Sequence, residues 1–297
     1  MIQKKRVMAL GFFDGVHIGH GALLEKTKQR AEENHAVPSV LTFDVHPDDL
    51  IFNAHIRLLS DAENRKETIQ RCYGIEDVIV LHFDRELMNM PWELFAGKII
   101  EEMNICALVV GHDFTFGQGG KGTAEKLQKF CAERNIGCDV IAPVMLDGQI
   151  ISSTYIRSLI EEGRVEAAER WLGHPYSLCD TVHHGFALGR KLDAPTINMF
   201  FPKGAAELKH GVYATKAVLP TGESYIAVTN VGVNPTVRNE GKLSVESHLL
   251  GYAGDLYGEK VRIDFYRYLR EEKKFNSVEE LSAQIKRDEK QALEILQ

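Results

Sequence analysis

The sequence predicts an α/β domain with a parallel sheet, followed by a smaller antiparallel all-β domain. Over residues 6–142, short apolar runs alternate with stretches of helical periodicity. From residue 176 onward, the pattern changes to short strands of period two that are separated by turns. The 297 residues, 44% of them hydrophobic, suffice for two cores. We place the two domains at residues 1–173 and 174–297.

In the first domain, strand and helix candidates follow each other along the chain. Such alternation builds βαβ units, in which the strands are parallel and helices cover both faces of the sheet. Ligands of such sheets bind beyond the carboxyl ends of the strands. We therefore expect the site among the segments that follow the first, second and fourth strands. The candidate strands are residues 7–12, 38–43, 77–82, 107–110 and 138–143, and the candidate helices are 21–34, 60–73, 91–104 and 122–135.

A glycine-rich turn follows the first predicted strand and leads into a helical pattern; residues 11–20 read GFFDGVHIGH. Free backbone N–H groups and the positive end of the helix dipole favour an anion at such a turn. His17 and His20 can project to the same side, and imidazoles donate hydrogen bonds to phosphate oxygens. The turn therefore predicts a nucleotide phosphate site. A zinc site and a purely structural role for the histidines are the alternatives.

Three more segments are candidates for the same site. Residues 43–47 (FDVHP) end a strand at a proline, and residues 110–117 (VGHDFTFG) follow the fourth strand. Residues 151–157 (ISSTYIR) open a helix, in which Arg157 opposes the helix dipole unless an anion lies nearby. Taken alone, the first two could be plain turns, and the serines and threonine of the third could be helix caps.

A formal match to the dinucleotide fingerprint occurs at Gly117, Gly119 and Gly122. The fingerprint should begin directly after its strand, in the first βαβ unit, and this match does neither. We therefore interpret residues 117–122 as a loop and do not predict NAD binding.

Bulk properties exclude several classes of protein. The net charge is −7 and no basic stripe is present, so we expect no nucleic-acid partner. The five cysteines are odd in number and form no Cys-x-x-Cys pair, which is typical of reduced thiols in the cytoplasm. No signal peptide and no apolar run of membrane-spanning length is present. We expect a cytoplasmic protein with small-molecule partners.

The second domain is predicted to be a small closed barrel. Two helices, at residues 151–162 and 165–172, precede it, and a terminal helix at 277–296 begins with a Ser277–Glu280 capping box. The candidate strands are residues 177–183, 211–219, 225–233, 243–250 and 259–268.

Residues 185–198 (GFALGRKLDAPTIN) carry the candidate chemistry of the second domain. A loop with Gly185, Gly189 and Arg190 could hold a phosphate through backbone donors and charge. Thr196 and Asn198 present two neutral oxygens on one side of an extended segment, which suits Mg²⁺ with retained waters. As a bare pattern, the segment could equally be a turn.

Together these motifs resemble those of the bacterial riboflavin kinase/FAD synthetase family. Residues 11–20 resemble the HxGH signature of nucleotidyltransferases in the form found in that family, and residues 151–157 resemble its Ile-Ser-Ser-Thr-x-Ile-Arg motif. Residues 185–198 resemble the phosphate and metal motif of riboflavin kinase. The resemblance implies a Rossmann-like nucleotidyltransferase domain and a riboflavin kinase-like β-barrel. It implies adenylyl transfer from ATP to FMN, giving FAD and pyrophosphate, and ATP-dependent phosphorylation of riboflavin.

The resemblance also implies a role for individual residues. His17, His20 and Arg157 would be catalytic in adenylyl transfer, and Glu246 would be the base in phosphorylation. ATP would be bound by Gly11, Phe12, Asp14, Gly15, Gly111, Ser153, Thr154, Gly185, Gly189 and Arg190, flavin by His46, Asp113, Phe116 and Arg270, and Mg²⁺ by Thr196 and Asn198.

Two departures from the kinase motif leave alternatives open. Asp180 and Asp193 stand where the motif usually has glycine. A negative charge near a triphosphate lowers the expected kinase rate by roughly a hundredfold. One alternative is thus an FMN adenylyltransferase with a weak or inactive kinase domain, and another is a non-catalytic flavin-binding protein. A nucleotidyltransferase for another substrate is a third, although such enzymes lack the barrel.

Overall fold

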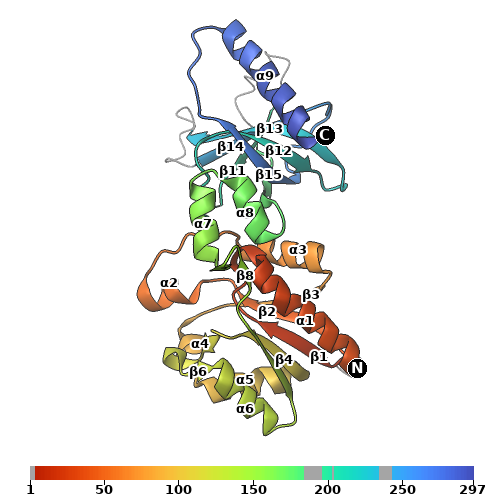
Figure 1. The fold of residues 1–297 in the computed structure, drawn as a ribbon, viewed down its shortest axis with the longest axis vertical. Coiled ribbons are helices and arrows are strands. Elements are labelled where there is room, and N and C mark those ends of the chain that lie inside the picture. Colours follow the sequence, from red (N-terminus) through yellow and green to blue (C-terminus); the bar gives the residue numbers. More distant parts are fainter. Residues whose placement is uncertain (1–3, 184–195, 203, 234–242) are drawn as a thin grey trace. The chain divides into compact units, whose positions relative to one another are not determined.

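The computed structural model describes residues 4–183, 196–202, 204–233 and 243–297. The chain forms two compact units, Met1–Ser153 and Thr154–Gln297, each with its own main sheet (Figure 1).

The first unit is built on a parallel sheet of five strands in the order β3-β2-β1-β4-β7. The chain adds strands on one side of β1 and then crosses to the other side with β4. This reversal between β1 and β4 is the place where sheets of this kind bind ligands. The prediction of a parallel α/β sheet is confirmed. The strands are β1 (Arg6–Leu10), β2 (Val37–Phe43), β3 (Asp77–Leu81), β4 (Ile105–Gly111) and β7 (Gly137–Ile141).

Alternating side chains of β1 pack into two separate cores, one on each face of the sheet. Met8 and Leu10 pack with α5 (Trp92–Glu102) and α6 (Ala124–Ala132) on one face of the sheet. Val7 and Ala9 pack with residues of α1 (Ile18–Asn34) and α3 (Ala62–Tyr73) on the other. All four β1 side chains are buried, as expected for a strand covered on both faces.

The shortest elements of this unit were not predicted, because they span too few residues to show a period. Two of them are helices, α2 (Pro47–Phe52) and α4 (Arg85–Asn89). The others are the 3₁₀ turns η1 (Asp14–Val16) and η2 (Gln118–Gly120) and two hairpins, β5 (Thr115–Phe116) with β6 (Gly122–Thr123) and β8 (Met145–Leu146) with β9 (Gln149–Ile150).

The second unit has an antiparallel sheet in the order β10-β15-β12-β13-β14-β11. Its two edges approach each other, because His183, just after β10, pairs with Asn198 of β11 and donates its backbone N–H to the Asn198 carbonyl at 2.8 Å. The sheet is thus curled into a partly closed barrel, and the prediction of a small antiparallel β-barrel is confirmed. Its strands are β10 (Tyr176–Thr181), β11 (Thr196–Phe200), β12 (Gly211–Val218), β13 (Ser224–Val233), β14 (Leu243–Leu249) and β15 (Lys260–Arg270).

Three helices accompany this sheet in the described part of the chain: α7 (Ser153–Glu161), α8 (Val165–Leu172) and α9 (Val278–Leu296). The predicted cap of the terminal helix is confirmed, since the Ser277 hydroxyl accepts the Glu280 N–H at 3.2 Å.

Candidate functional site

The turn between β1 and α1 has a left-handed backbone conformation that most of its residues do not favour. Phe13, Gly15 and Val16 have φ values of 60°, 72° and 47°. A left-handed conformation is easy for glycine but costly for a β-branched residue such as valine. Neighbouring segments must therefore hold the turn in this shape.

Asp14 is one of the residues that hold the turn. Its buried carboxylate oxygen Oδ1 accepts the backbone N–H groups of Leu59 at 2.9 Å and Ser60 at 3.2 Å. The Ser60 hydroxyl in turn accepts the Gly15 N–H at 3.2 Å. The structure thus gives Asp14 an anchoring role that the sequence did not suggest, and its predicted contact with ATP stays a prediction.

His17 and His20 lie together at the start of α1. Their rings stack at a centroid distance of 3.6 Å, and His17 Nδ1 caps the helix by accepting the His20 N–H at 3.2 Å. Nδ1 of His20 is buried and has no hydrogen-bond partner among the described residues. Burial lowers the pKa of His20 well below its usual value, and the nearby His17 and Arg65 lower it further. His20 is therefore neutral near pH 7 and can act as a hydrogen-bond donor.

Ser153, the last residue of the first unit and the first residue of α7, contacts this turn. The hydroxyl of Ser153 donates to the backbone carbonyl of Asp14 at 3.0 Å, across 139 positions of sequence. A Cβ placed on Gly19 would lie 3.7 Å from Ile151 Cβ, so Ile151 also contacts the start of α1. Two of the predicted motifs thus meet. Thr154 and Arg157 follow Ser153 on α7, in the second unit.

The other predicted ATP-binding residues of the first unit lie at the ends of β1 and β4. Gly11 donates its N–H to the Leu41 carbonyl at 3.3 Å, and the Phe12 ring lies edge-on to His46 at 4.5 Å between centroids. Gly111 ends β4, where a Cβ would approach Asp113 Oδ1 to 3.0 Å. These positions border the reversal of strand order in the sheet.

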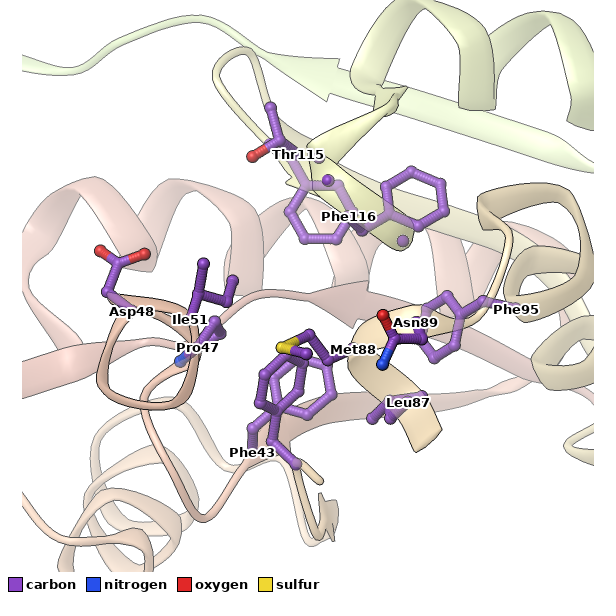
Figure 2. Close-up of a pocket in the computed structure, with 15 residues that line it drawn as sticks. Phe43, Pro47, Asp48, Ile51, Leu87, Met88, Asn89, Phe95, Thr115 and Phe116 are labelled. Carbon is purple, nitrogen blue, oxygen red and sulfur yellow. The ribbon is translucent and has the colours of Figure 1, made fainter. Parts of the chain in front are cut away.

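An apolar cavity of about 310 Å³ lies in the same unit (Figure 2). Phe43 at the end of β2, residues of α2 and α4, and the hairpin residues Thr115 and Phe116 surround it. A cavity with aromatic walls and few polar groups suits a flat aromatic ligand. It is lined by Phe43, Pro47, Asp48, Ile51, Phe83, Leu87, Met88, Asn89, Phe95, Phe114, Thr115, Phe116, Gly117, Gly119 and Gly120.

Of the four predicted flavin residues, Phe116 lines this cavity. His46 caps α2, directly before the lining residue Pro47, and Asp113 precedes the lining residue Phe114. Arg270 lies in the second unit, where its guanidinium binds the Asp288 carboxylate of α9 at 2.7 Å. The sequence analysis missed the apolar lining residues, because phenylalanines and methionines near strand ends resemble ordinary core residues.

In the second unit, the predicted base and the predicted metal ligands share one part of the sheet. Glu246 of β14 is directly opposite Asn198 of β11 on one side and Asn230 of β13 on the other. Residues in register on neighbouring strands point to the same face, and Thr196 lies two positions from Asn198 on that face. Asn230, which the sequence analysis did not select, donates to the Glu272 carboxylate at 3.0 Å.

Asp180 has a structural partner at the edge of the barrel. Its Oδ2 accepts the Phe200 N–H at 3.0 Å and lies 3.6 Å from His183 Nε2. The carboxylate thus helps to join β10 to β11, a role that glycine could not fill. Asp193 and the predicted phosphate-loop residues Gly185, Gly189 and Arg190 lie outside the described residues.

Two further observations concern the alternatives raised by the sequence. Within residues 4–183, 196–202, 204–233 and 243–297, no group of three His, Cys, Asp or Glu side chains is placed to hold a metal ion. In the same ranges, no helix is both long enough and apolar enough to cross a membrane.

Comparison with known proteins agrees with the fold of both units. The family model for FAD synthetase matches residues 1–155, and that for riboflavin kinase matches residues 172–296. Bifunctional riboflavin kinase/FMN adenylyltransferases of Listeria monocytogenes and Bacillus subtilis are each 34% identical to the chain. The first alignment covers 96% of the chain and 90% of that protein, and the second 98% and 92%.

A crystal structure from Streptococcus pneumoniae has a similar fold over both units. It superimposes with a TM-score of 0.84 at 30% identity, over 98% of this chain and 94% of that one. Its title calls that protein a macrolide-efflux protein, whereas neither matching family model describes an efflux protein. On its fold, its two sets of motifs and its relatives, the chain belongs to the family of bifunctional riboflavin kinase/FMN adenylyltransferases.

Proposed function

We propose that the chain makes FAD in two steps, with ATP as co-substrate in both. Residues 174–297 phosphorylate riboflavin to FMN, and residues 1–173 transfer the adenylyl group of ATP to FMN, releasing pyrophosphate. The observation that supports this most directly is the hydrogen bond from Ser153 to Asp14. It joins the two nucleotide motifs in the unit that also holds the aromatic-walled cavity.

In the adenylyl transfer step, an FMN phosphate oxygen attacks the α-phosphorus of ATP, and the bond to pyrophosphate breaks. The nucleophile is already ionised, so the protein contributes alignment and charge stabilisation rather than a base. His17 and His20, with the N–H groups that begin α1, would donate hydrogen bonds to the α- and β-phosphates. Ser153, Thr154 and Arg157 would hold the leaving pyrophosphate, and Gly11, Phe12, Gly15 and Gly111 would bind the rest of ATP.

The isoalloxazine ring of FMN would occupy the aromatic-walled cavity. Replacing Phe116 by alanine removes one wall and is expected to raise the KM for FMN about tenfold, with riboflavin phosphorylation unchanged. Phe52→Ala is the matched control, because Phe52 is 72% exposed and does not line the cavity. Steady-state rates at varied FMN concentration measure the effect. An unchanged KM in Phe116→Ala would place the ring elsewhere.

In the kinase step, Glu246 would take the proton of the ribityl terminal hydroxyl while that oxygen attacks the γ-phosphorus of ATP and ADP leaves. An alcohol is a weak nucleophile, so a positioned carboxylate is the group required. Glu246 is half-buried beside Asn198 and Asn230, which limits its freedom to move.

The residues near Glu246 fit a magnesium ion. Thr196 and Asn198 supply uncharged oxygens, and Mg²⁺ takes few protein ligands when phosphates and waters complete its octahedron. When bound, the ion offsets the negative charge of the triphosphate. Excess EDTA is expected to stop FMN formation and FAD formation, and added Mg²⁺ to restore both; activity that persists in EDTA would contradict the magnesium requirement.

One assay tests the whole assignment. The protein is incubated with ATP and either riboflavin or FMN, and the flavins are separated by chromatography. We expect FMN from riboflavin and FAD from FMN. FAD without FMN formation would support an inactive kinase domain, and the absence of both products would support a non-catalytic flavin-binding protein. We also infer a reducing, cytoplasmic setting, which the five free cysteines support.

A further inference from the structure

Arg65, on the first turn of α3, is a fully buried cation outside every predicted motif. Its Nη1 donates to the Phe12 carbonyl and, at 3.1 Å, to the Thr42 hydroxyl. The Thr42 hydroxyl itself donates to the same carbonyl at 2.8 Å. The guanidinium carbon also lies 4.0 Å from the centre of the Phe12 ring. Arg65 therefore contacts both the backbone and the side chain of Phe12.

The position of Phe12 makes these contacts important. It is followed by Phe13, the first left-handed residue of the turn that leads to His17. Fixing the Phe12 carbonyl fixes the orientation of the peptide that enters the turn. The same region of α3 supplies the second support, since Ser60 and Leu59, just before the helix, bind Asp14 and Gly15. The start of α3 and the segment before it thus support the entry and the middle of the strained turn.

Stability does not account for a buried arginine here. Its Nε and Nη2 are buried and make no hydrogen bond with the described residues. Burying a charge with unsatisfied donors is costly, and an apolar side chain would fill the space at lower cost. Burial lowers the pKa of Arg65 to about 10, while the charges of Asp14, Asp61 and Asp44 act the other way. The residue therefore remains a cation near pH 7.

We propose that Arg65 is a positioning residue for adenylyl transfer: its guanidinium fixes Phe12 and thereby the turn that orients His17 and His20. The inference rests on the proposed function, because it assigns Arg65 a role only if the two histidines act on the nucleotide. Arg65 contacts neither histidine through a hydrogen bond in the described structure and is not itself a catalytic residue.

Two substitutions separate shape from charge. Arg65→Met keeps the length but removes the hydrogen bonds and the charge, whereas Arg65→Lys keeps the charge without the planar group. Arg65→Met is expected to lower kcat for FAD formation about 100-fold, because small misplacements of catalytic groups have effects of that size. The KM for FMN is expected to change less than about threefold, since the aromatic-walled cavity is untouched. Arg71→Met, an exposed arginine on the same helix, is the control and should match the wild type.

The pH dependence of kcat/KM is a second measurement, and it would not change if Arg65 had a purely structural role. Burial lowers the pKa of His20 most, followed by the neighbouring His17 and then by the charge of Arg65. Removing the charge in Arg65→Met raises that pKa, so the acid limb of kcat/KM should move to higher pH. In Arg65→Lys the positive charge is retained, so the acid limb of the kcat/KM profile should not shift, whereas kcat should fall. Lysine also preserves the buried charge, so this variant tests the proposal even if Arg65→Met does not fold.

The controls distinguish failure of this proposal from failure of the proposed function. Riboflavin phosphorylation by the same preparations reports that the second unit is intact. Near-ultraviolet circular dichroism, to which aromatic side chains of both units contribute, reports side-chain packing, so a changed spectrum with unchanged phosphorylation indicates loosened packing of the first unit. Wild-type kcat and an unmoved acid limb in folded Arg65→Met would overturn the proposal for Arg65 alone. If His17→Ala and His20→Ala also retain FAD formation, the proposed site itself is wrong.

Discussion

Replacing His17 or His20 by alanine is expected to lower FAD formation from FMN at least about 100-fold, the usual effect of removing a donor that stabilises transition-state charge. The rings stack on each other, and Nδ1 of His17 caps α1 through the His20 N–H. Each substitution therefore removes a predicted phosphate donor and loosens its neighbour. For this reason we expect the double variant to lose little more than either single variant.

FMN formation from riboflavin should remain near the wild-type rate in these variants. The proposed kinase residues Glu246, Thr196 and Asn198 all belong to the other unit of the chain. Both reactions are measured on one preparation, with chromatographic separation of riboflavin, FMN and FAD. Equal loss of both activities in a folded variant would contradict the assignment of the reactions to separate sites. His35→Ala, an exposed histidine at the end of α1, is the matched control.

Glu246→Gln is expected to have the reverse effect of the histidine variants: it should impair phosphorylation of riboflavin and leave adenylyl transfer intact. Glutamine keeps the size and hydrogen-bonding capacity of the side chain but cannot accept a proton, so FMN formation should fall by about 100-fold to 10,000-fold. FAD formation from added FMN should not change. Glu223→Gln, on an exposed turn between β12 and β13, is the control. Undiminished phosphorylation of riboflavin by Glu246→Gln would show that another group takes the proton.

The variant Asp180→Gly tests why the kinase motif departs from glycine at this position. Since this carboxylate joins β10 to β11 through the Phe200 N–H, Asp180→Gly should lower the melting temperature. If its charge also repels the triphosphate, the same variant should phosphorylate riboflavin faster. The sequence suggested only the second effect, because the hydrogen bond depends on a strand pairing that sequence spacing does not reveal.

Long, periodic elements were predictable from the sequence. Most of β1 and of β4 is a continuous apolar run, and helices such as α3 are bounded by a cap and a glycine. The roles of single charged residues were not predictable. Arg65 lies in a helix of mostly polar residues, where charges normally face solvent, yet its side chain has no solvent exposure.

The site was predictable where a motif is contiguous and was not where distant segments contribute. The turn at residues 11–20 places His17 and His20 together because they are three positions apart on one helix. The aromatic-walled cavity takes residues from several separate segments between Phe43 and Gly120. Only the folded chain brings these segments side by side. Residues 43–47 and 110–117 could be selected from the sequence, whereas Ile51, Phe83, Phe95 and the lining residues of α4 lie in segments with no distinctive pattern.

The left-handed Val16 has a consequence for engineering the enzyme. A valine at φ 47° costs on the order of 1–3 kcal/mol, but its side chain is fully buried in the core of the first unit and its loss costs about as much, so Val16→Gly should not stabilise the protein. The same change would also make the backbone of the turn more flexible, so the side chains of His17 and His20 would no longer be held in one orientation. Relieving the strain at this position is therefore expected to lower turnover without a gain in stability, so Val16 should be left unchanged when the enzyme is engineered.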